Sequence, residues 1–142
     1  MIKFLNTEKL EEFPIEIDRL VKLLNGEFSF HKEVNIIFID ERKIKELNRE
    51  YREKDEVTDV LSFNIDSDDT FGEIYLCPEY VINQFNEDKH IEEILRLIIH
   101  GLLHLKGYEH KSKFNEVDYK GEPMYIKQEE ILNKFLNEMI QK

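Results

Sequence analysis

The stretch Ile91-Glu-Glu-Ile-Leu-Arg-Leu-Ile-Ile-His100-Gly-Leu-Leu-His104-Leu-Lys-Gly107-Tyr-Glu-His110 joins a helical apolar pattern to three of the chain's five histidines. These histidines stand at i, i+4 and i+10, and Gly107 lies between the second and the third. Residues four apart on an α-helix lie on the same face, so the rings of His100 and His104 can point at one place. A glycine at the helix end accepts the left-handed conformation that reverses the chain, which can bring His110 back toward the other two rings.

This spacing predicts a metal site. Three neutral imidazoles suit a single zinc ion and leave a fourth tetrahedral position open, as catalytic sites do. Other transition ions, such as Ni²⁺, also accept three imidazoles. We therefore expect one Zn²⁺ ion at His100, His104 and His110. His31 and His90 are not part of such a spaced group of histidines, and we assign neither a function.

A helix from about Ile91 to Leu105 explains the residues around the histidines. At ~100° per residue, the apolar positions of this segment form one continuous stripe, and His100 and His104 fall on the opposite side. We expect the stripe to pack into the core and the histidine face to line a cleft or to face solvent. The stripe consists of Ile91, Ile94, Leu95, Ile98, Leu102 and Leu105.

Length and composition predict a single globular domain over residues 1–142. Hydrophobic residues make up 41% of the chain and charged residues 36%, which is typical of a folded, soluble domain. No apolar run approaches the length of a membrane span, and the N-terminus lacks the apolar region of a signal peptide. The single cysteine, Cys77, excludes an internal disulfide and fits a cytoplasmic protein, in which it is more often a small buried hydrophobe than a metal ligand.

The net charge of −11 does not by itself predict a nucleic-acid-binding protein, because such proteins usually carry basic surface. The basic residues are nevertheless unevenly distributed. For most of them a solvated helix face with alternating charges is the simplest interpretation. Six fall within thirteen positions: Arg42, Lys43, Lys45, Arg49, Arg52 and Lys54.

The order of the predicted elements favours an α+β fold with about five helices packed on one sheet of roughly four strands. Asp40 is expected to cap the second helix, and Asn25-Gly26 to stop the first. The acidic loop with Asp66, Asp68 and Asp69 resembles a calcium site only weakly and is better interpreted as a solvated turn. Strands are expected at 2–5, 34–39, 58–65 and 72–77, and helices at about 14–24, 41–51, 78–85, 91–105 and 123–140.

Gly101 argues against a conventional peptidase. The spacing His-x-x-x-His-x-x-Gly-x-x-His is that of a long zinc-peptidase motif, in which a glutamate after the first histidine is the general base. Here that position is glycine. Phosphodiester hydrolysis, by contrast, develops charge on phosphoryl oxygens, which an arginine fork matches. Arg52, expected in a loop that leads into a strand, is the best candidate for this role, although a plain solvent-exposed arginine is an equally good interpretation of the sequence alone.

Three blocks of the sequence resemble the YbeY family, and a late stretch, Met124 to Leu132, is similar to the family's last helix. The resemblance therefore covers nearly the whole chain. The blocks are Tyr51-Arg52-x-Lys54-Asp55-x-x-Thr58-Asp59-Val60-Leu61-Ser62-Phe63, then Gly72-Glu73-Ile74, then His100-Gly101-x-Leu103-His104-Leu105-x-Gly107-Tyr108-Glu109-His110.

The resemblance implies a zinc-dependent, single-strand-specific endoribonuclease of rRNA maturation and ribosome biogenesis in the cytoplasm. Its partners would be single-stranded RNA, precursor rRNA, and the small ribosomal subunit with its assembly factors. It also implies a mixed sheet over the histidine helix, similar to zinc-peptidase-like folds. The metal ligands would be His100, His104 and His110, with His100 and Arg52 catalytic and Arg52 also binding substrate.

Two alternatives and one residue assignment stay open. A metallopeptidase with a three-histidine zinc site fits the spacing and the acidic charge, and a non-catalytic ribosome-assembly factor with a structural metal fits an acidic chain that needs help to hold RNA. The group that orients a histidine or relays a proton could be Glu109, Glu73 or Asp59.

Overall fold

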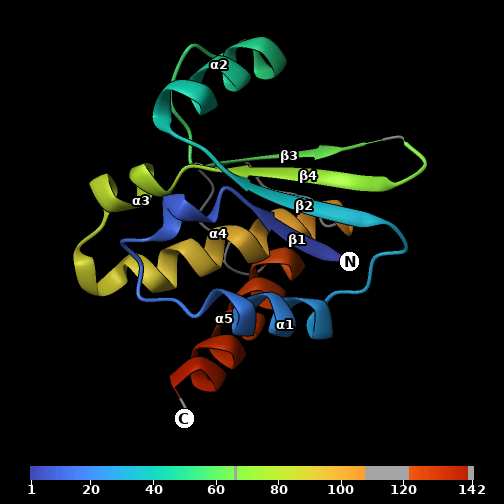
Figure 1. The fold of residues 1–142 in the computed structure, drawn as a ribbon, viewed down its shortest axis with the longest axis vertical. Helices are drawn as coiled ribbons and strands as arrows, with labels where there is room; N and C mark the ends of the chain where they lie inside the picture. Colours follow the sequence, from blue (N-terminus) through green and yellow to red (C-terminus); the bar gives the residue numbers. More distant parts are fainter. Residues whose placement is uncertain (66, 108–121, 141–142) are drawn as a thin grey trace.

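Four strands form one mixed sheet in the order β1-β2-β4-β3 (Figure 1). The structure, a computed structural model, describes residues 1–65, 67–107 and 122–140. Strand β1 pairs with β2 and β2 with β4 in parallel, whereas β3 runs antiparallel to β4. The α+β fold and the mixed four-stranded sheet predicted from the sequence are therefore confirmed. The strands are β1 (Ile2–Leu5), β2 (Glu33–Phe38), β3 (Val60–Asn64) and β4 (Thr70–Leu76).

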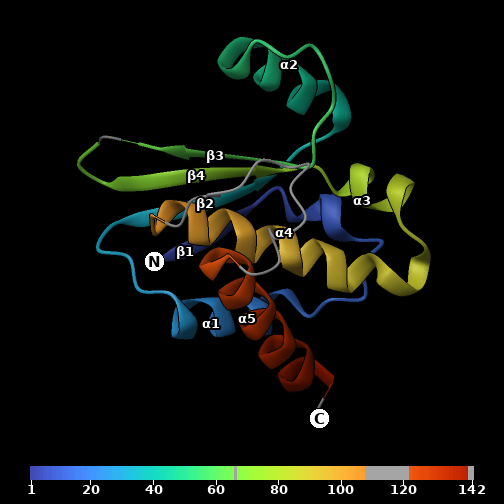
Figure 2. The same cartoon turned by 180° about the vertical axis from the view of Figure 1, so that it is seen from behind.

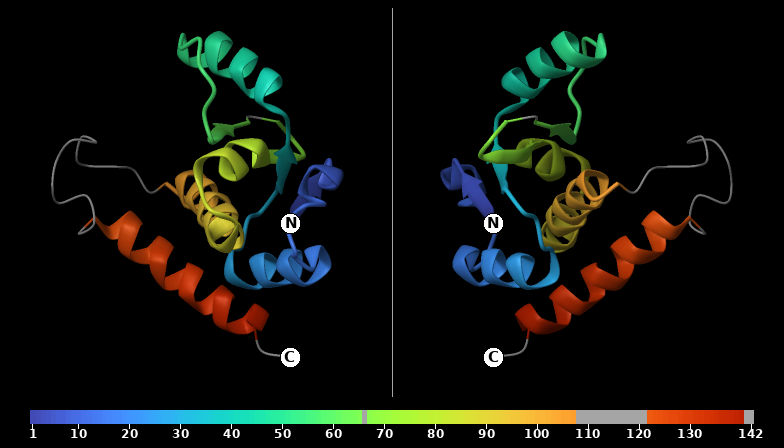
Figure 3. Two further views of the ribbon diagram at one scale, coloured as in Figure 1. Left: turned by 90° about the vertical axis from the view of Figure 1, so that its left-hand side faces the viewer. Right: turned by 90° about the vertical axis from the view of Figure 1, so that its right-hand side faces the viewer.

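The helices cover the two faces of the sheet unequally. Helix α2 lies on one side of the sheet, and α1, α4 and α5 lie on the other (Figures 1 and 2). Helix α5 packs on α4 from the side that faces away from the sheet (Figure 3). The helices are α1 (Ile17–Glu27), α2 (Glu41–Arg52), α3 (Pro78–Gln84), α4 (His90–Leu105) and α5 (Pro123–Ile140), and the two 3₁₀ helices are Thr7–Leu10 and Glu87–Lys89.

Strand alternation produces a separate apolar cluster on each face of the sheet, because successive side chains of a strand point to opposite faces. The α4 side holds Val34, Ile36 and Phe38 of β2 in the main core, together with α1, α4 and α5. The smaller cluster on the α2 side contains Ile44 of α2 and Leu61 of β3. The sheet thus separates α2 from the histidine-bearing helix α4.

Helix α4 approaches the sheet closely near its C-terminal end, where glycines lie at the contact. A Cβ atom on Gly72 would lie 2.8 Å from Leu105 Cδ1, and one on Gly101 would lie 2.9 Å from Ile74 Cγ2. Side chains at these two positions would hold the helix away from the strands. The two glycines therefore set the depth at which the histidine-bearing part of α4 sits beneath β3 and β4.

The prediction that Asn25-Gly26 stops the first helix is wrong. Helix α1 begins at Ile17, three residues after Pro14, and continues through this pair to Glu27. The Asn25 amide is used for tertiary contact: its Oδ1 accepts from the Ile2 N–H at 2.8 Å, and its Nδ2 donates to the Ile2 carbonyl at 3.1 Å. The Asn25 Nδ2 also donates to the Val21 carbonyl of α1 at 3.0 Å, so the amide joins the helix to β1 without ending it.

Helix α2 has the N-cap that the sequence predicts. The Asp40 side chain accepts a hydrogen bond from the Lys43 N–H at 2.8 Å, which satisfies one of the free N–H groups of the first turn. We expect Asp40→Ala to lower the free energy of unfolding by about 1 kcal/mol. Urea denaturation beside Glu50→Ala, an exposed change on the same helix, measures this effect; equal stability of the two variants would contradict it.

Candidate metal centre on helix α4

His100 and His104 converge on α4. Their Nε2 atoms lie 3.1 Å apart, and their ring centroids lie 4.6 Å apart at an interplanar angle of 77°. Two imidazole nitrogens bound to one tetrahedral zinc ion, each at about 2.05 Å, are separated by about 3.3 Å. The pair therefore already has nearly the separation that one ion requires. Both residues are half-buried on the helix side that the sequence pattern assigns to them, while Ile98 and Leu102 are buried in the core.

The helix ends in the manner predicted from Gly107. This residue has φ +100°, in the left-handed region, and its N–H donates to the His104 carbonyl at 3.0 Å. The chain thus turns immediately after the second histidine. His110 and Glu109 lie outside the described residues, so the third ligand stays a prediction.

The donor set fits a borderline transition ion, since neutral imidazole nitrogen is a preferred zinc ligand. Within 1–65, 67–107 and 122–140, no group of three or more His, Cys, Asp or Glu side chains is arranged to hold a metal. The described part of the chain therefore includes two of the three predicted ligands, His100 and His104. A complete site needs at least one more, and His110 is the residue for which the sequence argues.

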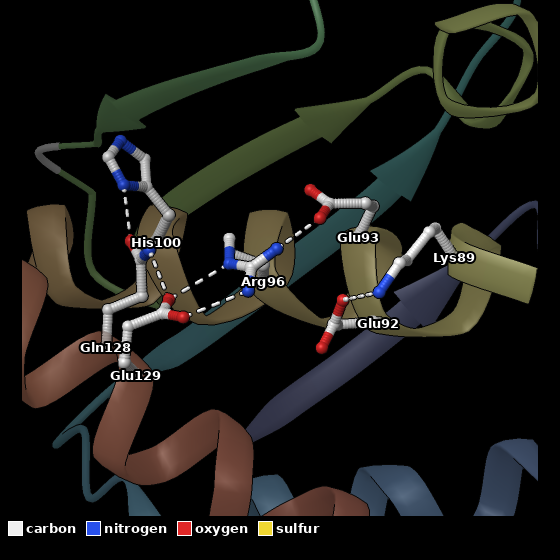
Figure 4. Close-up of polar contacts among 7 residues, drawn as sticks. All are labelled: Lys89, Glu92, Glu93, Arg96, His100, Gln128 and Glu129. Atoms are coloured by element: carbon white, nitrogen blue, oxygen red, sulfur yellow. Dashed lines mark hydrogen bonds and ion pairs between the residues drawn. The ribbon is translucent and has the colours of Figure 1, made fainter. Parts of the chain in front are cut away.

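A side chain from the last helix supports the first histidine. Gln128 of α5 is buried, and its Oε1 lies 2.7 Å from His100 Nδ1 (Figure 4). This leaves His100 Nε2 as the nitrogen that faces His104. Sequence reasoning missed Gln128. The only signal was its place in the predicted last helix, because the packing of α5 on α4 that brings it to His100 is a tertiary feature.

Gly101 faces the sheet rather than a reacting group. A Cβ atom there would meet Ile74 Cγ2 at 2.9 Å and Ser62 Oγ at 3.1 Å. The position at which a peptidase carries its catalytic glutamate is thus closed by β3 and β4. This contact gives a structural reason for the glycine and weighs against the peptidase alternative.

Two glycine variants test how tightly α4 packs against the sheet at Gly101. Gly26 of α1 has no atom within 4 Å of an added Cβ, so Gly26→Ala reports the helix-propensity gain alone, about 1 kcal/mol. We expect Gly101→Ala to be less stable than Gly26→Ala by about 1–3 kcal/mol, the usual cost of overpacking. Thermal or urea unfolding of the two variants measures the difference, and equal stability would show that α4 can move away from the sheet freely.

Arg52 is the last residue of α2, not a loop residue as predicted, and it is exposed. Its neighbour Tyr51 contacts Phe63 of β3, with ring centroids 5.1 Å apart. Phe63 belongs to the cluster on the α2 side of the sheet, whereas Ser62 approaches Gly101 on the other side. Arg52 and the histidines therefore flank strand β3 from opposite faces, and the described structure does not place the guanidinium beside the two rings.

Asn48 holds the segment that follows Arg52. Its side chain is buried and donates from Nδ2 to the Glu56 carbonyl at 2.9 Å. Its backbone carbonyl accepts from the Lys54 N–H at 3.3 Å and also from the Glu53 N–H. Glu53 itself has a left-handed backbone, with φ 57°. These contacts fix the end of α2, and with it the base of the Arg52 side chain.

The other candidate groups lie away from His100 or are already engaged. The Tyr75 hydroxyl donates to Glu73 Oε1 at 3.0 Å, on the sheet face opposite α4. Burial, and to a lesser extent this hydrogen bond, raise the pKa of Tyr75 to about 12. Asp59 Oδ1 accepts from the Val60 N–H at 2.8 Å, just before β3. Cys77 lies in the cluster on the α2 side, and burial raises the pKa of its thiol to about 11, so the metal-binding thiolate is disfavoured.

The fold and the site together define an α+β domain with a pair of converging imidazoles on a helix beneath a mixed sheet. The model of the endoribonuclease YbeY family matches residues 3–136. An Endoribonuclease YbeY of Thermotoga petrophila is 35% identical over 97% of this chain and 91% of its own length, and one of Staphylococcus saprophyticus is 32% identical over 88% of each. The chain belongs to the endoribonuclease YbeY family, and its enzyme class is that of an endoribonuclease.

A solved structure agrees with this assignment. The solution structure of TM1509 from Thermotoga maritima has 33% sequence identity and a TM-score of 0.62, covering 97% of this chain and 91% of that one. The family resemblance seen in the sequence is therefore confirmed. Among the described helices, none combines the length and the apolar composition needed to cross a membrane.

Proposed function

We propose that this protein is a zinc-dependent endoribonuclease that cleaves single-stranded RNA during rRNA maturation in the cytoplasm. The observation that carries the proposal is the 3.1 Å separation of His100 Nε2 and His104 Nε2 in a chain of the endoribonuclease YbeY family. Single-stranded precursor rRNA is the proposed substrate, with the small ribosomal subunit and its assembly factors as partners.

His100, His104 and His110 are the residues that would hold the metal. A bound zinc ion supplies a Lewis-acid charge that polarises a phosphodiester and makes water more acidic. The protein's part is to keep the histidine nitrogens deprotonated and aimed at one point. The helix spacing brings the Nε2 atoms of His100 and His104 together, and the Gln128 contact supports the ring of His100.

Arg52 is proposed to bind a substrate phosphate. Its guanidinium is exposed at the end of α2, and no ion pair within the described ranges occupies it. A planar guanidinium can donate two parallel hydrogen bonds to phosphate oxygens. These bonds become stronger as negative charge grows on the oxygens in the transition state. Because Arg52 lies across β3 from the histidines, it is proposed to contact an RNA strand that crosses this edge strand.

Tyr51 supports a single-stranded rather than a duplex substrate. It is 64% exposed beside Arg52, and its ring already packs against Phe63. Unpaired bases stack on such aromatic side chains, whereas bases within a duplex are covered by their neighbours. An exposed aromatic ring next to a phosphate-binding arginine suits a strand with accessible bases.

One experiment separates the proposal from the two alternatives. We expect purified, zinc-loaded protein to cleave single-stranded RNA, to lose this activity after chelation and to regain it with zinc, while it leaves duplex RNA and unstructured peptides intact. Peptide cleavage would favour the metallopeptidase. RNA binding that persists unchanged after chelation, with no cleavage at any stage, would favour the assembly factor.

The salt dependence of RNA binding tests the direct contact with phosphate. The chain carries a net charge of −11, so binding without a partner depends on a few local cations such as Arg52. We expect the logarithm of affinity to fall linearly with the logarithm of salt concentration, and the slope to become shallower by about 1 in Arg52→Ala. A slope that is unaffected by this change would place Arg52 away from the RNA.

A further inference from the structure

A series of polar contacts links His100 to the N-terminal half of α4 through residues of α5 (Figure 4). His100 Nδ1 lies 2.7 Å from Gln128 Oε1, and Gln128 Nε2 donates to Glu129 Oε2 at 3.1 Å. Glu129 accepts two hydrogen bonds from Arg96, both at 2.9 Å, and Arg96 also pairs with Glu93. In this series of contacts Arg96 can only donate and ionised carboxylates can only accept, whereas the roles of the His100 ring nitrogens depend on the tautomer.

The carboxylate of Glu129 fixes the orientation of the Gln128 amide. An ionised carboxylate only accepts hydrogen bonds, so the amide nitrogen, which only donates, must be the end that faces Glu129. The amide oxygen then faces His100. The hydrogen bonds that Arg96 donates raise the pKa of its own guanidinium and lower the pKa of Glu129, so Glu129 remains an ionised acceptor.

The amide orientation in turn determines the tautomer of His100. An amide oxygen only accepts, so Nδ1 of a neutral His100 must carry the proton and Nε2 must carry the lone pair. This lone pair is on the nitrogen that lies 3.1 Å from His104 Nε2. A flipped amide would present its N–H groups to Nδ1, and the proton would then move to Nε2, where it blocks a metal.

We propose that Gln128 is a positioning residue that holds His100 in its Nδ1–H tautomer, and that Glu129 and Arg96 lock the Gln128 amide in the required orientation. The inference rests on the proposed role of His100 as a metal ligand. Gln128 touches neither metal nor RNA in this scheme. It acts through His100, and the link to α5 makes the site depend on the docking of that helix on α4.

A merely structural role for Gln128 is the alternative, since its contacts also join two helices. The tautomer of His100 distinguishes the two roles, and it can be measured in the metal-free protein by two-bond ¹⁵N–¹H correlation spectra of the imidazole ring, at a pH well above the usual histidine pKa. We expect wild-type His100 to be the Nδ1–H tautomer. Observation of the Nε2–H tautomer in wild type would overturn the proposal.

Two substitutions and one control complete the test. Gln128→Ala is expected to shift His100 toward the Nε2–H tautomer and to weaken zinc binding by roughly 10- to 100-fold. Gln128→Glu places a carboxyl group beside the Glu129 carboxylate, where the pair would share one proton in place of the Nε2–H donor. The other carboxyl oxygen still faces His100 as an acceptor, so this variant should keep the Nδ1–H tautomer. Asn133→Ala removes an exposed amide from the same helix and should change neither quantity.

Each outcome bears on the proposal. An unchanged tautomer and affinity in Gln128→Ala would overturn it, and so would loss of the Nδ1–H tautomer in Gln128→Glu. If Gln128→Ala does not fold, the wild-type and Gln128→Glu spectra still decide. Failure of the proposed function looks different: the tautomer and the zinc affinity would follow the scheme, while RNA would stay uncleaved.

Discussion

His100→Ala is expected to lose metal binding and RNA cleavage together. The change removes one of the two described nitrogens that converge at 3.1 Å, and His104 alone cannot hold an ion at this point. The metal is proposed to supply several kcal/mol of transition-state stabilisation, so a loss of about 4 kcal/mol corresponds to a fall of about 1,000-fold in cleavage rate. Zinc content by mass spectrometry and cleavage of a single-stranded RNA measure the two effects.

The matched control for this variant is His31→Ala. His31 is an exposed histidine before β2, in edge contact with Phe71, and it is no part of the α4 site. It should retain zinc and activity. Normal zinc content in His100→Ala would contradict the assignment of His100 as a ligand, and zinc loss without loss of cleavage would show that the ion has no part in the reaction.

Arg52→Ala is expected to keep its zinc and lose turnover. The guanidinium lies across β3 from the histidines, so its removal leaves the ligands and the Gln128 contact intact. Loss of one preorganised donor to a developing oxyanion typically lowers kcat by about 100- to 1,000-fold. Single-turnover cleavage beside zinc analysis separates this effect from loss of metal.

Two further variants show whether the effect is specific to the guanidinium of Arg52. Arg42→Ala removes an exposed arginine from the first turn of the same helix and should cleave at the wild-type rate. Arg52→Lys keeps the charge but not the planar fork, so it should restore only part of the activity. If Arg52→Ala cleaves RNA normally, Arg52 is a surface arginine and the proposed path of the RNA across β3 is wrong.

The long helices could be predicted because their apolar residues recur at helical spacing in the sequence. Helix α5 runs over Pro123–Ile140 as expected, and α4 begins one residue before the expected start at Ile91. The histidine pair follows from helix geometry alone, since an i, i+4 spacing fixes the relative position of two rings. Gly107 ends α4 as predicted, because its left-handed backbone suits a residue without a Cβ.

The features that the sequence did not predict depend on contacts between distant segments. Asn25-Gly26 looked like a stop, but Asn25 bonds to Ile2 of β1 and the helix continues. Gln128 supports His100 only because α5 packs on α4, a contact between residues 28 positions apart. Arg52 was expected in a loop that leads into a strand, yet α2 continues to this residue, where the contacts of Asn48 hold the end of the helix.

X-ray absorption spectroscopy of the zinc-loaded protein shows directly whether histidine nitrogens bind the ion. We expect three imidazole nitrogens and one oxygen at about 2.0 Å from the zinc, and a His100→Ala sample that binds no stoichiometric zinc. A sulfur ligand at about 2.3 Å would contradict it. So would a zinc spectrum without imidazole scattering, because an ion held elsewhere would leave the paired histidines of α4 without the role assigned to them.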